Sequence, residues 1–338
     1  MITDRDPEFV QTVTALYRDE LGRDPDPGGM MTFLGFARAG WTGEQIRAAL
    51  HDSPEGIAYR AKPKAPPVPF LSVVGNDFVD ATGKRTVLCG CDAFDDYLFW
   101  LSGRADKVGP FLEESQKIKA VVRRVFLMGD AVENTVFTIH PLEIASFYEQ
   151  LVPFVRFENA HGCIPLLTVN ADAQRAMPDA GDRLHNWQRI AWTLRGSGLA
   201  YLLSAGNEHN KNGYDPYADV DDPGVIWSRG SSLEDQQTPP RGATASELHA
   251  TRISWDRTLE DAVASPHNMR AVSGSGMCWM TEGIPVTQDT DPQLLWKYGR
   301  ALSVEWALAI FHDRQGQRGL LRTEAILESA IAFGEGMK

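Results

Sequence analysis

The sequence predicts an α/β fold, a (β/α)8 TIM barrel, with a small all-α domain in front of it. Three observations favour this arrangement. From Phe70 onward, short apolar runs alternate with helical stretches, the pattern of parallel βαβ units. Eight such runs fit between Val87 and His312, in a chain of 338 residues that has room for a barrel of about 250 residues. Finally, a proline-rich stretch marks the point where the pattern changes.

The first 60 residues have the signals of short helices. Asp6-Pro7 and Asp26-Pro27 each offer an N-cap side chain followed by a proline, which is favoured at the first helical position. Thr42-Gly-Glu-Gln45 has the form of a capping box, and Ser53-Pro54 begins a last short turn. We therefore expect a separate helical domain over residues 1–60.

Residues 61–69 contain four prolines in nine positions. Such a segment is extended and semi-rigid, because each proline fixes its own backbone and restricts its neighbour. The sequence thus predicts a helical module over 1–60, a linker over 61–69 and a barrel over 70–338.

Within the barrel, residues 70–88 have the pattern of a β-hairpin that precedes the first barrel strand. Two helices between strands are clearly marked, at 187–195 and at 292–306, the second capped by Asp291. The expected barrel strands lie near 87–91, 121–128, 163–170, 199–206, 225–228, 248–252, 277–281 and 307–312.

Composition excludes several functional classes. The net charge of −12 disfavours a general affinity for nucleic acid, and no run of eighteen apolar residues predicts a membrane span. The N-terminus carries no apolar secretion segment, so either the sequence is trimmed at its start or the protein leaves its cell by another route, such as lysis or within a virion, and its localisation stays open. The four cysteines lie in apolar runs without metal-ligand spacing, so we expect buried free thiols, no metal and no cofactor.

Two of the apolar runs end on acidic residues. Tyr201-Leu-Leu-Ser-Ala-Gly leads into Asn207-Glu208, and Met277-Cys-Trp-Met-Thr leads into Glu282. A (β/α)8 barrel presents its chemistry at the carboxyl ends of its strands. A retaining glycosidase needs two carboxyl groups about 5–5.5 Å apart, and a neighbouring amide can bind the sugar 2-hydroxyl. We therefore expect Glu208 to be the acid/base, Glu282 the nucleophile and Asn207 a substrate ligand.

Other polar and aromatic residues occupy expected strand ends. Arg124 would steady the charge of the nucleophile through a charge-assisted hydrogen bond. Taken singly, each of these residues is more often structural than functional. The further candidates for substrate binding are Asp92, Asp172, His249 and His312 as hydrogen-bonding groups, and Trp279 and Trp227 as stacking surfaces.

Residues 70–338 resemble a clan A glycoside hydrolase, the group that includes cellulases and mannanases. The resemblance rests on the hairpin Val74-Gly75-x-x-Phe-Val-Asp80-x-x-Gly83-Lys84, on Arg124, on Asn207-Glu208 and on Thr281-Glu282-Gly283. It implies the acid/base role for Glu208 and the nucleophile role for Glu282.

The N-terminal segment resembles a short helical module of bacterial surface proteins and phage tail proteins, through Leu16-Tyr17-Arg18-Asp-Glu-Leu21-Gly22-Arg23-Asp-Pro25-Asp26-Pro-Gly28. This resemblance implies a virion, tail or cell-surface partner and a phage-encoded protein.

The leading hypothesis is therefore a retaining glycoside hydrolase that cleaves a polysaccharide by double displacement, through two carboxylates. Two alternatives stay open. One is a non-catalytic carbohydrate-binding or receptor-recognition protein on the same scaffold, and the other is a structural tail protein that uses the barrel only as a scaffold.

Overall fold

A computed structural model describes residues 6–21, 25–61, 71–129, 139–171, 173–207, 215, 220, 223–232, 243–249, 277–282, 285–286, 290–313 and 321–338. The chain divides into two compact units, Met1–Pro66 and Pro67–Lys338. Among the helices that the structure describes, none is both long enough and apolar enough to cross a membrane.

The smaller unit consists of four helices: α1 (Asp6–Leu21), α2 (Pro27–Arg38), α3 (Gly43–His51) and α4 (Pro54–Ala61). The Asp26 side chain caps α2 by accepting a hydrogen bond from the Gly29 amide, at 2.8 Å. The capping box expected at Thr42 is present, with both of its hydrogen bonds to Gln45. A small apolar core joins α1, α2 and α3 and is formed by Val13, Leu16, Tyr17, Leu21, Ala37, Ile46 and Leu50.

The larger unit begins with a three-stranded antiparallel sheet, in the segment where the sequence predicts a β-hairpin. It consists of β1 (Ser72–Val74), β2 (Asp77–Val79) and β3 (Arg85–Thr86). Phe78 on β2 is fully buried, and its ring stacks on Trp279 with centroids 6.2 Å apart. The sheet thus supplies an apolar cover to the interior of the main sheet.

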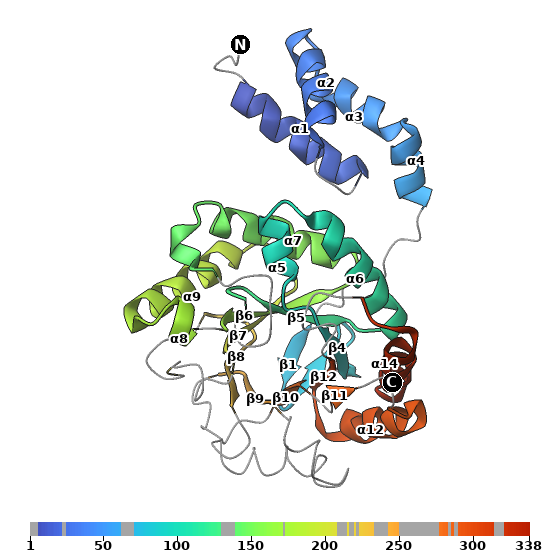
Figure 1. Ribbon diagram of the computed structural model, residues 1–338, viewed down its shortest axis with the longest axis vertical. Coiled ribbons are helices and arrows are strands. Elements are labelled where there is room, and N and C mark those ends of the chain that lie inside the picture. The colour runs from blue at the N-terminus through green and yellow to red at the C-terminus, as the bar shows by residue number, and fades with distance from the viewer. Residues whose placement is uncertain are drawn as a thin grey trace. The chain divides into compact units, whose positions relative to one another are not determined.

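Parallel strands follow and form a curled sheet. Each strand pairs with the next in chain order, β10 also pairs with β12, and β12 pairs with β4, so the pairings form a ring. This is a TIM-barrel-like α/β fold (Figure 1). The strands of the ring are β4 (Leu88–Asp92), β5 (Val122–Phe126), β6 (Ile164–Asn170), β7 (Leu202–Gly206), β8 (Trp227–Ser232), β9 (Ala245–His249), β10 (Met277–Glu282) and β12 (Leu308–Asp313).

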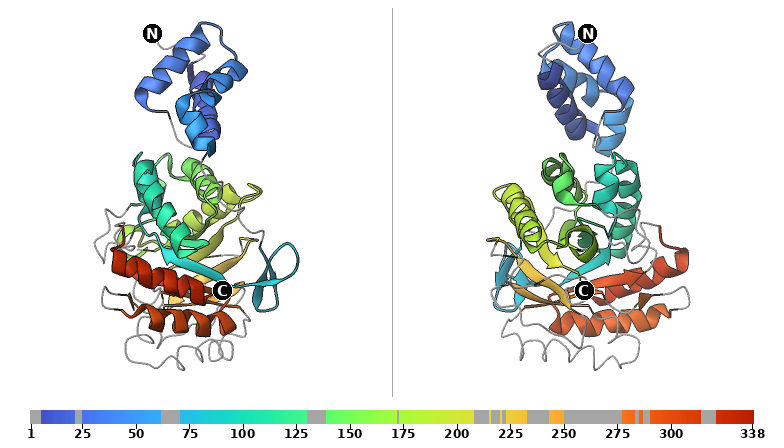
Figure 2. Two further views of the ribbon diagram at one scale, coloured as in Figure 1. Left: turned by 90° about the vertical axis from the view of Figure 1, so that its right-hand side faces the viewer. Right: turned by 60° about the vertical axis from the view of Figure 1, so that its left-hand side comes forward.

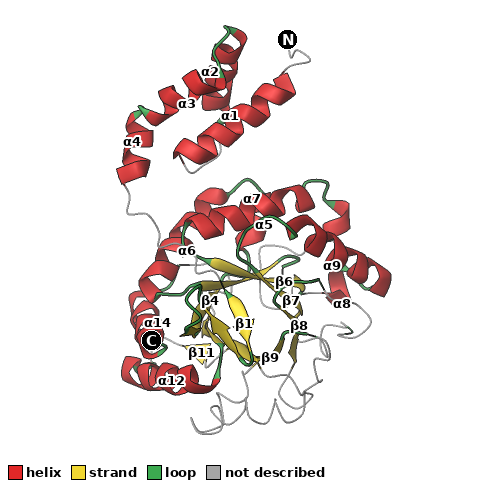
Figure 3. Ribbon diagram, turned by 180° about the vertical axis from the view of Figure 1, so that it is seen from behind, coloured by secondary structure: helices red, strands yellow, loops and turns green. Residues whose placement is uncertain are grey.

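Helices lie outside the curled sheet (Figures 1 and 3). The two helices predicted most clearly from the sequence are present as α9 (Ala180–Leu194) and α12 (Pro292–Glu305), the latter capped by Asp291. Figure 2 shows α12 beside α14 (Glu324–Gly336). The remaining elements are α5 (Asp96–Leu101), α6 (Ala105–Ile118), the 3-10 turn η1 (Pro141–Glu143), α7 (Phe147–Ala160), α8 (Ala173–Ala176) and the short strand β11 (Pro285–Val286), which pairs with β12.

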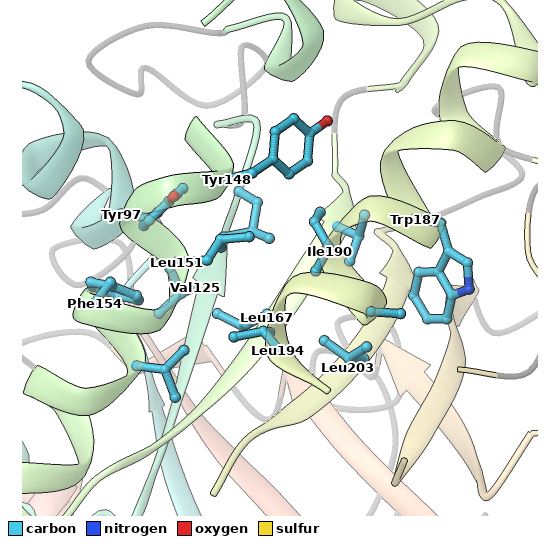
Figure 4. Packing of buried hydrophobic residues seen from close by; sticks show 14 of the residues in the cluster. Tyr97, Val125, Tyr148, Leu151, Phe154, Leu167, Trp187, Ile190, Leu194 and Leu203 are labelled. Atoms are coloured by element: carbon cyan, nitrogen blue, oxygen red, sulfur yellow. The ribbon is translucent and has the colours of Figure 1, made fainter. Parts of the chain in front are cut away.

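The largest apolar cluster fills the space between the outer face of β5–β8 and helices α5, α7 and α9 (Figure 4). Leu151 and Phe154 of α7 and Leu194 of α9 are fully buried in it. Burying a side chain of this size contributes about 1.5–3 kcal/mol relative to leaving it exposed. This cluster therefore holds the helices against the strands that carry the candidate site.

Side chains along each strand alternate between the interior of the ring and its outer face, as β geometry requires. On β5, Val122 belongs to the interior apolar cluster and Val125 to the outer one. The adjacent arginines of this strand consequently meet different surroundings. Arg124 lies in the interior with Val122, whereas Arg123 lies on the helix side with Val125.

Arg123 forms a buried charge cluster with two carboxylates. Its guanidinium pairs with Glu158 of α7 at 2.6 Å and with Asp96 of α5, and all three side chains are 0–1 % exposed. Burial raises the pKa of Asp96 to about 6 and that of Glu158 to about 7, although Arg123 opposes both shifts. The thiols of Cys91 and Cys163 also face this cluster, and burial raises the pKa of both.

This cluster predicts that stability falls as pH rises from about 4.5 to about 7. The ordinary pKa values of Asp96 and Glu158 are 3.8 and 4.5, so in this window the folded protein binds more protons than the unfolded chain. Glu158→Gln removes one of the two titrating groups and should make the decline shallower. Urea unfolding at pH 5 and pH 7.5, followed by tryptophan fluorescence, measures both slopes. Equal slopes for wild type and variant would contradict the assignment.

Candidate active site

Polar side chains gather inside the ring toward the carboxyl ends of its strands. The amino ends are lined by an apolar layer that includes Leu88, Val122 and Leu308. Farther along the same strands the buried interior becomes polar. The buried polar residues at or near the carboxyl ends are Asp92, Arg124, Thr168, Asn170, Ser204, Asn207, Ser228, Glu247, Thr281 and His312. A buried polar layer of this kind, at the end of the barrel where chemistry is usually presented, is the candidate active site.

Arg124 connects the two strand ends that carry the candidate catalytic carboxylates. Its Nη2 donates to Asn207 Oδ1 at 2.8 Å, and its Nη1 donates to the Thr281 carbonyl oxygen at 3.4 Å. Asn207 directly precedes Glu208, and Thr281 directly precedes Glu282. One guanidinium therefore contacts the residue before each carboxylate, although the two contacts lie 83 and 157 residues away in sequence.

Aromatic rings fix the position of this guanidinium. The Arg124 Cζ atom lies 5.0 Å from the centroid of Phe126 and 5.5 Å from that of Phe94. These two rings stack on each other with centroids 3.8 Å apart. The side chain of Arg124 is completely buried, so these cation–π contacts act with little competition from water.

Glu247 is a member of this site that the sequence analysis did not single out. Its Oε1 lies 3.5 Å from Arg124 Nη2, and its Oε2 accepts hydrogen bonds from Ser204 at 2.7 Å and from Ser228. The strand was expected at 248–252, whereas β9 begins at Ala245, so Glu247 fell just outside the prediction. The alternation of Ala245, Glu247 and His249 was the signal that could have revealed it.

Asp92 and His312 form a second buried polar pair at the mouth of the ring, that is, at the carboxyl ends of its strands. Asp92 Oδ2 lies 3.0 Å from His312 Nδ1, and both side chains are nearly buried. Arg322, which lies outside the strands, forms hydrogen bonds to the ends of both strands. Its Nη2 donates to the Asp92 carbonyl oxygen at 3.3 Å, and its Nε donates to Asp313 Oδ2 at 2.8 Å. The structure thus brings together two residues predicted separately as ligands of sugar hydroxyls.

The structure describes the side chain of neither candidate catalytic carboxylate. Glu208 and Asp172 lie outside the described residues. The backbone of Glu282 ends β10 and pairs in register with His249 of β9, while the side chains of these two residues are not described. The register of the pairing between β10 and β9 shifts between Met280 and Glu282.

The backbones of β7 and β8 come unusually close together at the carboxyl ends of these strands. The pairing of β8 with β9 shifts register between Ser228 and Ser231, and Gly230 within this shift has a φ of +101°. A Cβ atom at Gly230 would lie 2.5 Å from the Gly206 carbonyl oxygen. Only glycine fits where β8 passes this close to the backbone just before Asn207.

The structure corrects the prediction that Trp279 and Trp227 stack on substrate. Trp279 is fully buried in the interior apolar cluster and stacks on Phe78. Trp227 faces the helices and packs against Trp187, with ring centroids 5.3 Å apart. Both rings are core residues, because their positions along the strands direct them to an apolar layer rather than to the mouth.

A cavity of about 620 Å³ lies elsewhere, and its lining includes β3 and the start of β4. Its lining includes Lys119, at the C-cap of α6, and Lys338, just beyond α14. Cations at helix C-termini offset the negative end of the helix dipole. The lining residues of this cavity are not those of the candidate active site.

Two further chemical features bear on the site. Among the residues that the structure describes, no group of three or more His, Cys, Asp or Glu side chains could hold a metal ion. The four cysteines are buried and form no disulfide, and burial raises the pKa of Cys89 and Cys163 well above the ordinary value for a thiol.

Comparison with solved structures finds glycoside hydrolases, family 5 among them. A candidate glycoside hydrolase from Bacteroides vulgatus ATCC 8482 has a TM-score of 0.56 at 14% identity, over 77% of this chain and 59% of that one. The GH5_18 structure from Streptomyces cattleya, in complex with GlcNAc, has a TM-score of 0.51 at 11% identity, over 75% and 80%. A family 5 glycoside hydrolase from Bacteroides vulgatus ATCC 8482 has a TM-score of 0.50 at 9% identity, over 72% and 62%.

No protein-family model matches the chain, and no curated protein sequence matches it either. The chain spans 59% and 62% of the length of the two Bacteroides proteins. At identities of 9–14%, these similarities show the fold alone, a TIM-barrel-like α/β fold of the kind that glycoside hydrolases use.

Proposed function

We propose that the larger unit is a retaining glycoside hydrolase that cleaves a polysaccharide or oligosaccharide by double displacement. Glu208 is the proposed acid/base and Glu282 the proposed nucleophile. The observation that carries the proposal is the position of Arg124, whose guanidinium contacts both Asn207 and Thr281. Because one guanidinium contacts the residues next to Glu208 and Glu282, the two carboxylates are expected to lie at the short separation of about 5–5.5 Å that a retaining mechanism requires.

The proposed first step is attack by the Glu282 carboxylate on the anomeric carbon. A C–O bond forms to the enzyme while the glycosidic C–O bond breaks, and Glu208 donates its proton to the departing oxygen. In the second step, Glu208 takes a proton from water, which attacks the same carbon and releases Glu282. Arg124 would stabilise the carboxylate form of the nucleophile, and Asn207 would bind the sugar 2-hydroxyl.

The remaining mouth residues are proposed to orient the sugar. Asp92 and His312 lie at neighbouring strand ends and form a hydrogen-bonded pair that could bind two adjacent hydroxyl groups. His249 and Asp172 keep their predicted role as substrate ligands in this proposal, because each terminates or follows a strand of the ring.

Release of reducing ends from a panel of polysaccharides tests this function. NMR of the first product should show the anomeric configuration of the substrate, as double displacement requires. An inverted product would contradict the retaining mechanism. Saturable sugar binding without any turnover would favour the alternative, a non-catalytic carbohydrate-binding or receptor-recognition protein.

For the helical unit we propose a docking role toward a virion, tail or cell-surface partner, in a phage-encoded protein. The proposal is supported by its resemblance to a helical module of such proteins and by exposed apolar side chains on its surface, Met31 and Ile57 among them. Co-sedimentation with bacterial envelopes or purified tails should be lost in a Met31→Glu variant whose turnover on a soluble substrate is unchanged. Unchanged co-sedimentation of the variant would contradict this surface as the contact.

A further inference from the structure

Glu247 and Arg124 form a charge pair that is sealed inside the ring. Both side chains are 0 % exposed, and their closest charged atoms are 3.5 Å apart. Ser204 of β7 and Ser228 of β8 donate hydroxyl hydrogen bonds to the Glu247 carboxylate. The carboxylate on β9 is thus fixed by the two strands that precede it in the ring.

Burying this charge pair in the interior of the barrel is energetically unfavourable compared with apolar packing. Desolvating two charges costs several kcal/mol per ion, and replacing a buried pair with packed apolar side chains is often neutral or stabilising. Stability alone therefore does not explain why a carboxylate and two serines occupy this layer.

The contacts of Arg124 indicate what the pair can do. The Nη2 atom that faces Glu247 is also the one that donates to Asn207 Oδ1, and Nη1 of the same group donates to the Thr281 carbonyl oxygen. A guanidinium is a rigid planar fork, so fixing one of its nitrogens fixes the direction of the other. Holding Nη2 beside Glu247 therefore sets where Arg124 meets both strand ends.

We propose that Glu247 is a positioning residue: it holds Arg124 in the orientation that brings Asn207 and the Thr281–Glu282 strand end together. This inference rests on the proposed function, since it assigns Glu247 a role in the same site. Glu247 acts through Arg124. A displacement of about 1 Å at a catalytic group can lower the rate by about 10²-fold.

The matched control is the other buried arginine pair of β5, in which Arg123 on the opposite face of that strand pairs with Glu158 of α7. Glu158 is likewise buried and likewise paired with an arginine of β5, at 2.6 Å from Arg123, but it lies on the helix side and outside the ring. Glu247→Gln and Glu158→Gln make the same chemical change to neighbouring arginine pairs. Only the first is expected to disturb the site.

The experiment compares wild type, Glu247→Gln and Glu158→Gln by kinetics and by NMR of arginine side chains labelled with nitrogen-15. Glu247→Gln should lower kcat by about 10- to 100-fold with KM changed less than about threefold, because it disturbs orientation rather than ground-state binding. It should also shift the Arg124 guanidinium resonances, assigned with Arg124→Lys. Glu158→Gln should leave kcat unchanged and shift only Arg123.

The outcomes separate this inference from the proposed function. A wild-type protein without turnover on any substrate contradicts the proposed function. An active wild type whose Glu247→Gln variant keeps its kcat overturns the inference alone. Arg124 resonances that do not move in Glu247→Gln overturn it whether or not a substrate is found.

Discussion

Glu282→Gln is expected to lower kcat by about 10⁶-fold, the size of loss seen when a covalent nucleophile is removed. Glu208→Gln should lower kcat by about 10²–10⁴-fold, because it removes general acid–base catalysis but leaves the nucleophile in place. Glu208 follows β7 in sequence and Glu282 ends β10, and Arg124 contacts the residue before each of them. Steady-state assays on the substrate identified by reducing-end release measure both losses.

Glu113→Gln is the control for this pair of variants, since Glu113 is an exposed glutamate on α6. It should keep wild-type turnover. Circular dichroism should show that all three variants are folded, and sugar binding should persist in the two site variants. Undiminished turnover in Glu282→Gln would remove the proposed nucleophile, and undiminished turnover in Glu208→Gln would remove the proposed acid/base.

Arg123→Met is expected to lower the free energy of unfolding by about 3–5 kcal/mol at pH 7.5, because it leaves Asp96 and Glu158 buried without their counter-ion. At pH 5 the loss should be smaller, since raised pKa values allow these carboxyl groups to take up protons. Urea unfolding at the two pH values, followed by tryptophan fluorescence, measures the difference. Eight of the nine tryptophans follow residue 66, so the signal reports mainly on the larger unit.

Arg156→Met serves as the control, since Arg156 is exposed on α7, two residues from Glu158. Its effect should lie within about 0.5 kcal/mol, as for most surface substitutions. A loss below about 1 kcal/mol for Arg123→Met at pH 7.5 would show that the buried cluster is compensated in some other way.

The two adjacent arginines illustrate how one strand serves both stability and the proposed chemistry. Arg123 joins β5 to helices α5 and α7 through Asp96 and Glu158. Arg124, one residue later, joins the same strand to the carboxyl ends of β7 and β10. Alternation along the strand separates the two roles, so a one-residue shift in register would exchange their surroundings.

The strands and helix caps could be predicted from the sequence because their signals are local. An apolar run, a capping box at Thr42 and an Asp291-Pro292 helix start each depend on a few neighbouring residues. The expected strands therefore lie close to the observed ones along the ring. The largest departures are at β7, which begins three residues later than expected, at β8, which ends four residues later, and at β9, which begins three residues earlier because Ala-Ser-Glu-Leu-His has little apolar character.

The partners of buried polar groups could not be predicted in this way. The sequence singled out Asp92, Arg124, Asn207 and His312, but only the closure of the ring pairs Asp92 with His312 across 220 positions. Only that closure brings Glu247 beside Arg124. The sequence also did not reveal how far along the ring a strand residue lies. Trp279 was therefore expected at the mouth, but it lies in the apolar interior.

The sequence by itself thus determined where strands end and which polar residues follow them, because backbone propensity and hydrophobic periodicity act over a few residues. The tertiary structure alone decided which of those residues meet, which face of a strand each arginine occupies and which aromatic rings are buried. Those outcomes depend on the register and closure of the whole sheet, which set contacts between residues tens to hundreds of positions apart.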